Sequence, residues 1–341
     1  MKSAFAVDCL SSKPGSVSCG YLPFGYLNDS TPVQIPVILV NGAQPGPTLW
    51  LSSTMHGIEI GGIEVIRRVT REITNPGKLR GQIIAWPILN PLAFRDAMTN
   101  TPQDLVNINR IFPGGPKQLV THRLADLITR HIPVADYFID FHANVAPSLV
   151  HSIVKRAPDR AVRAKSLEMA RAFGATLIFA EAHIENTPAG ATVMGGSFTE
   201  CTIRAGKPTV TVELNNSRRL DPVSVEAGVR GVCNVMRLLG MVDGEVVKQD
   251  VIQVLPDLYS RAVVISDKGG LVNILKGPGE PVTKGEVFLQ IRNPFGDLVD
   301  EVVSPVTGYV LAYPMQKNQA AGTGDYLAFL ITPYLGDFLG A

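Results

Sequence analysis

The residues best suited to chemistry in this chain are His56 and Glu59, which lie three positions apart in the segment Leu51–Gly62. An apolar run over Thr48–Leu51 stops shortly before them, and a pattern typical of a helix begins just after them. At a turn between a strand and a helix, an imidazole and a carboxylate at this spacing can both reach one Zn²⁺, which takes nitrogen and oxygen ligands at about 2.0–2.2 Å. The pair therefore predicts two ligands of a metal site.

A third ligand is predicted at His142, in the motif Asp140–His142 that follows the apolar run Tyr137–Ile139. A catalytic zinc site uses three protein ligands, one of them often distant in sequence, and keeps a fourth position open for water. The alternative is that His56 and Glu59 only cap a helix while His142 is a hydrogen-bonded core histidine. For the three residues together, we favour the metal site.

Glu213 is the candidate general base, because a metal-dependent hydrolase needs a group that accepts a proton from the attacking water. It follows the apolar run Thr209–Val212, so a strand would hold it at the same sheet edge as the metal ligands. A carboxylate partly buried among apolar neighbours has a raised pKa, which suits a general base. The alternative for Glu213 is a structural ion pair with Arg218 or Arg219.

Asn109 and Arg110 lie in a second segment with several candidate functional residues, Asn107–Gly115, which ends in Pro-Gly-Gly. Such an ending does not continue regular structure, and functional side chains concentrate on loops. The guanidinium of Arg110 offers a bidentate fork for a substrate carboxylate or for a polarised carbonyl. The sequence leaves these two roles open.

The elements that must position these side chains alternate between strands and helices. We predict strands at Thr48–Ser53, Gln82–Ile88, Tyr137–Phe141, Thr176–Phe179 and Thr209–Leu214, and helices near 60–74, 117–131, 158–173 and 222–239. This alternation is typical of an α/β fold with a mostly parallel, mixed sheet flanked by helices. The candidate residues stand at the ends of three of these strands, and ligands bind at the carboxyl edge of such sheets.

The length of 341 residues favours one large and one small domain. We predict a catalytic domain over residues 1–245, in which residues 1–47 read as short β segments broken by proline and glycine. After Gly244 the helical period disappears, and short β-branched runs broken by glycine and proline follow. Residues 246–341 are therefore predicted to form a smaller all-β domain.

The composition argues against several classes of function. Hydrophobic residues make up 45% and charged residues 18% of the chain, which favours a well-buried globular core over disorder. The net charge of +1, without a local Lys/Arg cluster, argues against nucleic-acid binding, and no stretch approaches the roughly 18 apolar residues that span a bilayer. The four cysteines show no Cys-x-x-Cys spacing, so we expect reduced thiols in a cytoplasmic protein. The oligomeric state stays open, and a homo-oligomer is compatible with the sequence.

Four motifs together resemble the succinylglutamate desuccinylase/aspartoacylase family, which belongs to the zinc-carboxypeptidase-like hydrolases. They are His56–Glu59, Asn109–Gly114, Asp140–His142 and Thr211–Glu213, in the order seen in that family. The resemblance runs over nearly the whole chain. This chain differs from the family at Ile58, where the family usually has asparagine. It also differs after Glu213, where Leu-Asn-Asn-Ser-Arg-Arg replaces a commoner glycine-rich loop.

The resemblance implies one zinc ion per chain, held by His56, Glu59 and His142, with Glu213 activating the metal-bound water. Asn109 and Arg110 match the Asn-Arg pair of the family, which helps to bind the substrate carboxylate and to polarise the scissile carbonyl. The changes at Ile58 and after Glu213 leave these residues in place, but they leave the identity of the substrate open.

The C-terminal β domain resembles the biotinyl/lipoyl-type barrel found in many members of the family, through Gly277–Ile291 and Ser304–Val310. A carrier domain would present a modifiable lysine on the turn between these segments, but the turn Arg292–Asp297 has none. We therefore expect a structural domain or a wall of the substrate cleft. Tyr309 and Tyr313 either reach that cleft or are ordinary barrel aromatics.

The function predicted from these features is a zinc-dependent amidohydrolase that removes a small acyl group, such as acetyl or succinyl, from an N-acylated amino acid or related amine. The alternatives are a metallocarboxypeptidase acting on small peptides and a catalytically inactive binding protein. The first is less favoured because a barrel beside the cleft narrows access. The second would be expected to lack a ligand or the base, and all are present.

Overall fold

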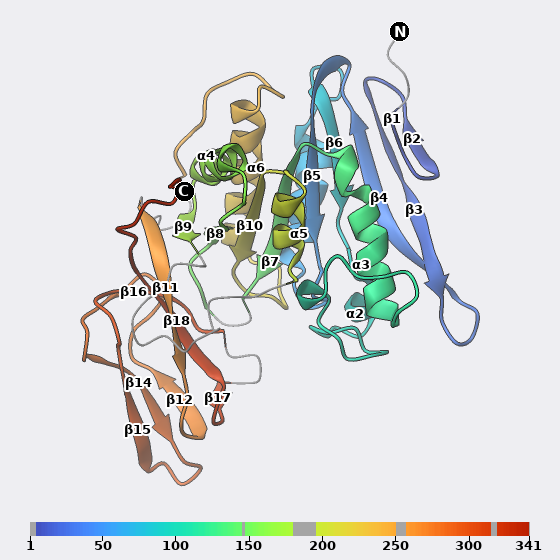
Figure 1. Ribbon diagram of the computed structural model, residues 1–341. Helices are drawn as coiled ribbons and strands as arrows, with labels where there is room; N and C mark the ends of the chain where they lie inside the picture. Colours follow the sequence, from blue (N-terminus) through green and yellow to red (C-terminus); the bar gives the residue numbers. More distant parts are fainter. Residues whose placement is uncertain (1–4, 145–146, 180–195, 250–256, 315–318, 341) are drawn as a thin grey trace.

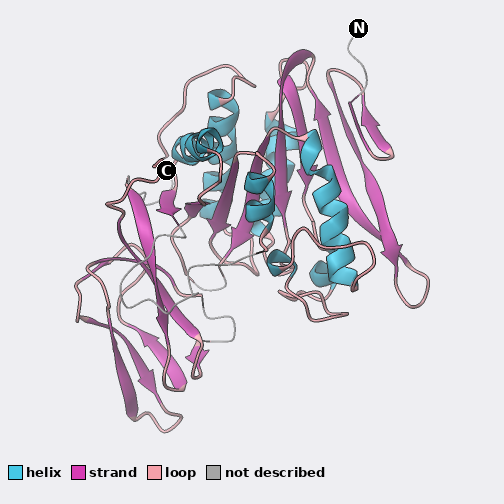
Figure 2. Cartoon of the chain, in the orientation of Figure 1, coloured by secondary structure: helices cyan, strands magenta, loops and turns pink. Residues whose placement is uncertain are grey.

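The computed structural model describes residues 5–144, 147–179, 196–249, 257–314 and 319–340. A long mixed sheet with helices packed on it runs through the molecule, and a smaller sheet lies at one end (Figure 1, Figure 2). This arrangement confirms the predicted class, an α/β fold with a smaller C-terminal β region.

The main sheet has twelve strands in the order β13-β16-β18-β11-β9-β8-β10-β7-β5-β6-β4-β3. The strands are β3 (Ser16–Tyr26), β4 (Pro32–Asn41), β5 (Gln44–Ser53), β6 (Arg80–Trp86), β7 (Tyr137–Ala143), β8 (His151–Val154), β9 (Thr176–Phe179), β10 (Thr209–Leu214), β11 (Leu258–Ile265), β13 (Pro281–Val282), β16 (Gly308–Ala312) and β18 (Tyr326–Pro333). Strands β6, β5, β7 and β10 form its parallel centre, and β8 and β4 border that centre in antiparallel pairings. The five predicted strands thus correspond to β5, β6, β7, β9 and β10.

The predicted helical stretches each contain a helix. The helices are α1 (Gly61–Arg68), continued by a π-helical turn over Val69–Ile73, then α2 (Pro91–Arg95), α3 (Val120–His131), α4 (Arg160–Phe173), α5 (Phe198–Arg204) and α6 (Pro222–Leu238), with 3₁₀ turns at Ile108–Arg110 and Ile132–Val134. Local signals set their ends: the Asp159 carboxylate accepts from the Ala161 amide at 2.6 Å at the start of α4, and Gly174 ends that helix with φ of 83°. None of the described helices is both long and apolar enough to cross a membrane.

Alternating side chains along the central strands supply a separate core on each face of the sheet. In β5, Leu49 and Leu51 belong to the core that includes residues of α1, α4 and α6. The intervening Trp50 belongs to the other core, where its ring stacks on Trp86 and Phe138, with centroids 4.8 Å and 5.6 Å away. Successive side chains of a strand point to opposite faces, so a continuously apolar strand is buried on both.

The C-terminal region is joined to the main sheet by hydrogen bonding. Strand β11 pairs in parallel with β9, and β18 pairs with β11, so the main sheet continues past residue 245. A second, antiparallel sheet has the order β15-β14-β12-β17, from β12 (Gly270–Ile274), β14 (Val287–Arg292), β15 (Leu298–Val303) and β17 (Ala320–Ala321). The division at residue 245 stays a prediction. Near the other end of the chain, β1 (Phe5–Val7) and β2 (Leu10–Ser12) form a hairpin.

Gly62 in α1 is a place where packing leaves no room for a side chain. A Cβ built there would lie 2.5 Å from Phe141 Cβ and would clash with the hydroxyl of Ser53. The first turn of α1 therefore packs directly on β5 and on β7, the strand that carries His142.

We expect Gly62→Ala to lower the free energy of unfolding by about 1–3 kcal/mol, the usual cost of overpacking a core. Helix propensity alone predicts the opposite sign, since alanine is favoured over glycine by about 1 kcal/mol. Chemical denaturation measures the change. Gly25→Ala is the control, because Gly25 has open space at its Cβ position. Equal stability of wild type and Gly62→Ala would contradict this account of the packing.

Candidate metal centre and active site

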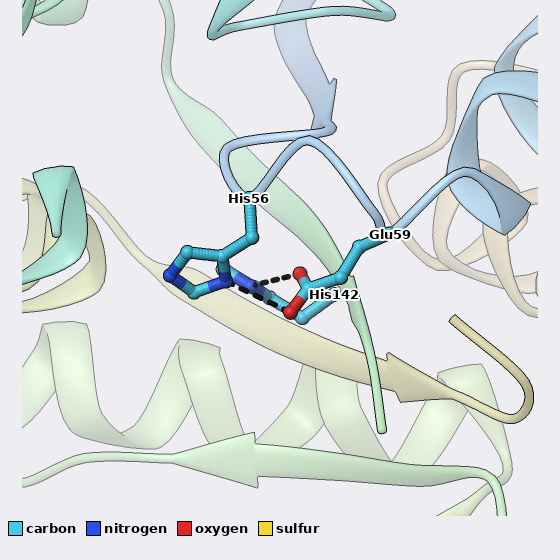
Figure 3. A group of neighbouring side chains, drawn as sticks. All are labelled: His56, Glu59 and His142. Atoms are coloured by element: carbon cyan, nitrogen blue, oxygen red, sulfur yellow. Dashed lines mark hydrogen bonds and ion pairs between the residues drawn. The ribbon is translucent and has the colours of Figure 1, made fainter. Parts of the chain in front are cut away.

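The three predicted ligands converge on one point (Figure 3). His56 lies in the loop after β5, Glu59 lies just before α1, and His142 is on β7. His56 Nδ1 is 2.8 Å from Glu59 Oε1, and His142 Nδ1 is 2.8 Å from Glu59 Oε2. The candidate ligand atoms all lie within 4.8 Å of one another, so the cluster could hold a metal ion.

The opposite nitrogens of the two rings are held by oxygen acceptors. His56 Nε2 is 3.1 Å from Asn107 Oδ1, and His142 Nε2 is 2.9 Å from Asp140 Oδ2. The other oxygen of Asp140 accepts a hydrogen bond of 2.6 Å from Ser52 Oγ. With a metal ion at Nδ1, the acceptor at Nε2 would hold the ring proton there and orient the ring.

Burial strengthens the electrostatic interactions among the charged groups of the cluster. His56 and Glu59 are each 8% exposed and His142 is 4% exposed. Burial alone would raise the pKa of Glu59, but the two imidazoles lower it to about 2. Burial likewise opposes a charge on His142, yet Asp140 and Glu59 raise its pKa well above the usual value.

The donor set fits a metal ion better than it fits helix capping. Helix α1 has Ile60 as its N-cap and receives no capping hydrogen bond from a side chain. The buried carboxylates of Glu59 and Asp140 raise the pKa of His142, and a bound metal cation could offset their charge in place of the ring proton. Two imidazole nitrogens and a carboxylate are ligands that zinc takes in catalytic sites.

The loop that carries His56 is held in a rare backbone conformation. Thr54, the residue after β5, has φ of 57°, a region that β-branched residues seldom adopt. Its hydroxyl donates to the Glu59 carbonyl oxygen at 3.2 Å, and its own carbonyl accepts from the Asn90 amide at 3.1 Å. These two buried hydrogen bonds offset the energetic cost of the unusual backbone conformation of Thr54. Such strained residues are common at functional sites.

Glu213 lies beside the cluster. In the parallel pairing of β10 with β7 it is opposite His142, and in the antiparallel pairing of β10 with β8 it is opposite His151. Burial, aided by the charge of Glu59, raises the pKa of Glu213 to about 7, although nearby positive groups act against this. Among the described residues, no salt bridge joins Glu213 to Arg218 or Arg219.

Asn109 and Arg110 lie on the 3₁₀ turn that faces the start of α5. Asn109 Oδ1 accepts from the Phe198 amide at 2.9 Å, so the side-chain oxygen of Asn109 already serves to anchor the loop. Arg110 is exposed, and its Nη1 donates to the Asn109 carbonyl at 2.7 Å. Partial desolvation lowers the pKa of Arg110, whereas the charges of Glu59 and Glu213 act in the other direction.

The two tyrosines singled out in the sequence lie in the C-terminal β region. Tyr313 is fully buried in its core and its hydroxyl donates to the Lys276 carbonyl. Tyr309 packs edge-on against Tyr259, with ring centroids 6.3 Å apart. Both therefore have structural contacts.

Sequence reasoning assigned no role to three supporting residues, Ser52, Asn107 and Asp140. A signal for Asp140 was present, because residues two apart on a strand share a face and Asp140 therefore lies beside His142. Ser52 and Asn107 carry no such signal. Their partners lie 88 and 51 positions away, so only the fold reveals the contacts.

Comparisons with known proteins show which family this chain resembles. The catalytic-domain model of the succinylglutamate desuccinylase/aspartoacylase family matches residues 45–239. The chain is 28% identical over 300 residues to the N-alpha-acetyl-L-2,4-diaminobutyric acid deacetylase of Halomonas elongata, covering 85% of this chain and 83% of that protein.

Two solved structures share the fold over almost the full length. A succinylglutamate desuccinylase/aspartoacylase from Rhodobacter sphaeroides has a TM-score of 0.81 and 25% identity, covering 94% of this chain and 96% of that chain. The product-bound ectoine utilization protein EutE (DoeB) from Ruegeria pomeroyi has a TM-score of 0.79 and 25% identity, covering 92% and 94%. Coverage this high means that the likeness includes the C-terminal β region as well as the main sheet.

We expect purified protein to bind about one zinc ion per chain and His142→Ala to lose most of it, because removing one of three ligands opens the coordination shell. Elemental analysis after zinc supplementation at neutral pH measures both. His131→Ala is the control, since His131 lies on α3 outside the cluster. A wild type without zinc, or a His142→Ala variant that retains it, would count against the site.

Proposed function

Since the chain belongs to the succinylglutamate desuccinylase/aspartoacylase family, we propose that it is a zinc-dependent amidohydrolase. It would remove a small acyl group, such as acetyl or succinyl, from an N-acylated amino acid or related amine. The deacetylase of Halomonas elongata acts on an N-acetylated amino acid, which supports this substrate class.

The observation that carries the proposal is the position of Glu213 beside the ligand cluster. Its backbone is in register with His142, and its side chain is not engaged in a salt bridge among the described residues. A carboxylate with a pKa near 7 can accept and return a proton near neutral pH. A metal site alone would bind a ligand, whereas a metal site with an adjacent base supports hydrolysis.

His56, Glu59 and His142 would hold the zinc ion, which when bound polarises a carbonyl and lowers the pKa of water. Glu213 accepts a proton from water as the water oxygen forms a bond to the amide carbon. The same carboxyl then gives that proton to the departing nitrogen as the C–N bond breaks. The products are a carboxylate from the acyl group and a free amine.

Arg110 would stabilise the negative charge that develops on the carbonyl oxygen. The charges of Glu59 and Glu213 act to raise the pKa of its guanidinium, which supports this role. A preorganised donor of this kind contributes most when it acts on the transition state. Asn109 holds the loop through its side-chain oxygen, which leaves its amide nitrogen as the group for the substrate.

We expect Glu213→Gln to retain zinc and the fold while kcat falls by about 10²–10⁴, the usual share of general-base catalysis. Glu168→Gln on the exposed side of α4 is the control. If Glu213→Gln also loses its zinc, Glu213 is a ligand and the assignment of roles is wrong.

The pH profile separates a base from a residue that only supports the structure. The base works when deprotonated, so kcat/KM rises with pH through the pKa of Glu213 and levels off above it. That pKa is about 7 without a metal, and a bound cation lowers it, so the acidic limb lies below pH 7. The limb disappears in Glu213→Gln if the proposal holds.

A panel of substrates tests the reaction itself. Zinc-loaded protein should hydrolyse N-acetyl, N-succinyl or N-formyl amino acids and should leave small peptides with a free amino terminus largely uncut. Release of amine is the measurement. Preferential cleavage of the peptides would instead favour a metallocarboxypeptidase, and zinc binding without turnover of either class would favour an inactive binding protein.

A further inference from the structure

His151, the first residue of β8, is a buried histidine that the mechanism above does not use. It is 1% exposed, and its Nδ1 lies 2.9 Å from the Leu149 carbonyl oxygen. A carbonyl oxygen only accepts, so Nδ1 carries the ring proton and Nε2 keeps a lone pair. Within the part of the chain that the structure describes, Nε2 has no hydrogen-bond partner. His151 therefore holds a buried acceptor that has no donor.

The strand register places His151 beside the proposed base. Glu213 is opposite His151 in the antiparallel pairing of β10 with β8, and opposite His142 in the parallel pairing of β10 with β7. Residues directly opposite in an antiparallel pair point to the same face of the sheet, with Cβ atoms about 4.5–5.5 Å apart. Glu213 thus has an imidazole on each neighbouring strand, and His151 is the one that is not a candidate metal ligand.

The two imidazoles differ in what they can offer to Glu213. Both ring nitrogens of His142 are engaged, since Nδ1 is 2.8 Å from Glu59 and Nε2 is 2.9 Å from Asp140. In His151 only Nδ1 is engaged. Of the two rings that flank the base, His151 is therefore the one that can accept a further hydrogen bond.

An acceptor is needed once Glu213 has taken a proton from water. An ionised carboxylate only accepts, so it forms no hydrogen bond with the Nε2 lone pair, and none joins Glu213 to His151 among the described residues. A protonated carboxyl gains an O–H donor, and a buried donor without an acceptor is costly. The free Nε2 of His151 lies on the strand beside it and can meet that need.

His151 is basic enough to accept this bond but not to remove the proton. Burial lowers the pKa of His151 to about 4, and the charge of Arg261 on β11 acts in the same direction. Burial raises the pKa of Glu213 to about 7. The proton therefore stays on Glu213, from which it can reach the departing nitrogen.

We propose that His151 is a positioning residue for the general base, in which Nε2 accepts a hydrogen bond from the protonated carboxyl of Glu213. This assignment rests on the proposed deacylase function. The proton passes from water to Glu213 and then to the nitrogen of the departing amine. The ring of His151 stays neutral throughout and fixes the orientation of the carboxyl between these two transfers.

Two substitutions of His151 distinguish an acceptor from a packing residue. His151→Phe keeps a ring but removes both nitrogens, and kcat should fall by about 3- to 10-fold, as for one neutral hydrogen bond, with little change in KM. His151→Gln keeps an acceptor oxygen and should recover part of this loss. If only packing mattered, phenylalanine would be the better replacement, because it matches the shape of the ring more closely.

His131→Phe is the matched control. His131 makes the same kind of local contact, with Nδ1 2.8 Å from the Leu127 carbonyl oxygen, but it lies on α3 against Trp86. This variant should keep the kcat of wild type. Zinc content and Tm, measured for all three variants, show whether a loss of kcat comes from a damaged site or fold.

The ¹⁵N resonance of His151 Nε2 reports on the same bond without turnover. In zinc-loaded wild type, lowering the pH from 8 to 5 should protonate Glu213 and shift this resonance, while the low pKa of His151 keeps its ring neutral. In Glu213→Ala the shift should be absent, because the donor is gone. His151→Phe identifies the resonance.

Several outcomes would overturn the role of His151 and leave the deacylase function standing. They are a wild-type kcat in His151→Phe, a His151→Gln variant no better than His151→Phe, and a resonance that does not shift or shifts equally in Glu213→Ala. A lack of turnover of every acyl substrate by wild type would contradict the proposed function instead. The resonance would then decide whether His151 accepts a hydrogen bond from Glu213.

Discussion

The geometry of the site depends on one carboxylate shared by two imidazole rings. One carboxylate oxygen of Glu59 lies 2.8 Å from Nδ1 of His56, and the other lies 2.8 Å from Nδ1 of His142. The Nε2 atoms of the two rings contact Asn107 and Asp140, respectively. Contacts to both nitrogens therefore restrict the orientation of each ring. Three further features hold this arrangement in place. They are the backbone conformation of Thr54, the close packing of α1 on β5 and β7, and the parallel centre of the sheet.

Much of this site was predictable because its residues stand at the ends of regular elements. The runs before His56, His142 and Glu213 have the length and composition of buried strands, and parallel strands bring their carboxyl ends to one edge of a sheet. The helical stretches between them favoured parallel strands, and β5, β7 and β10 do pair in parallel. Local sequence thus carried enough information to place ligands that are far apart along the chain.

Other features could not be predicted, because they arise from contacts between distant strands. Strand β8 has four residues, which are too few to show a period in the sequence. It lies between β10 and β9, and its pairing with β10 puts His151 opposite Glu213. The run Leu258–Ile265 reads as an ordinary strand with one polar interruption. Within the main sheet this strand lies between β18 and β9, and no local pattern specifies that position.

The order of the site residues and of β11 along the chain also determines when each is synthesised. All three candidate ligands and Glu213 lie before residue 215, whereas Arg261 follows 48 positions after Glu213. A ribosome adds about 5–20 residues per second, so roughly 2 to 10 seconds separate their emergence. The residues of the candidate site are thus synthesised before β11 and β18, the strands that extend the main sheet beyond β9.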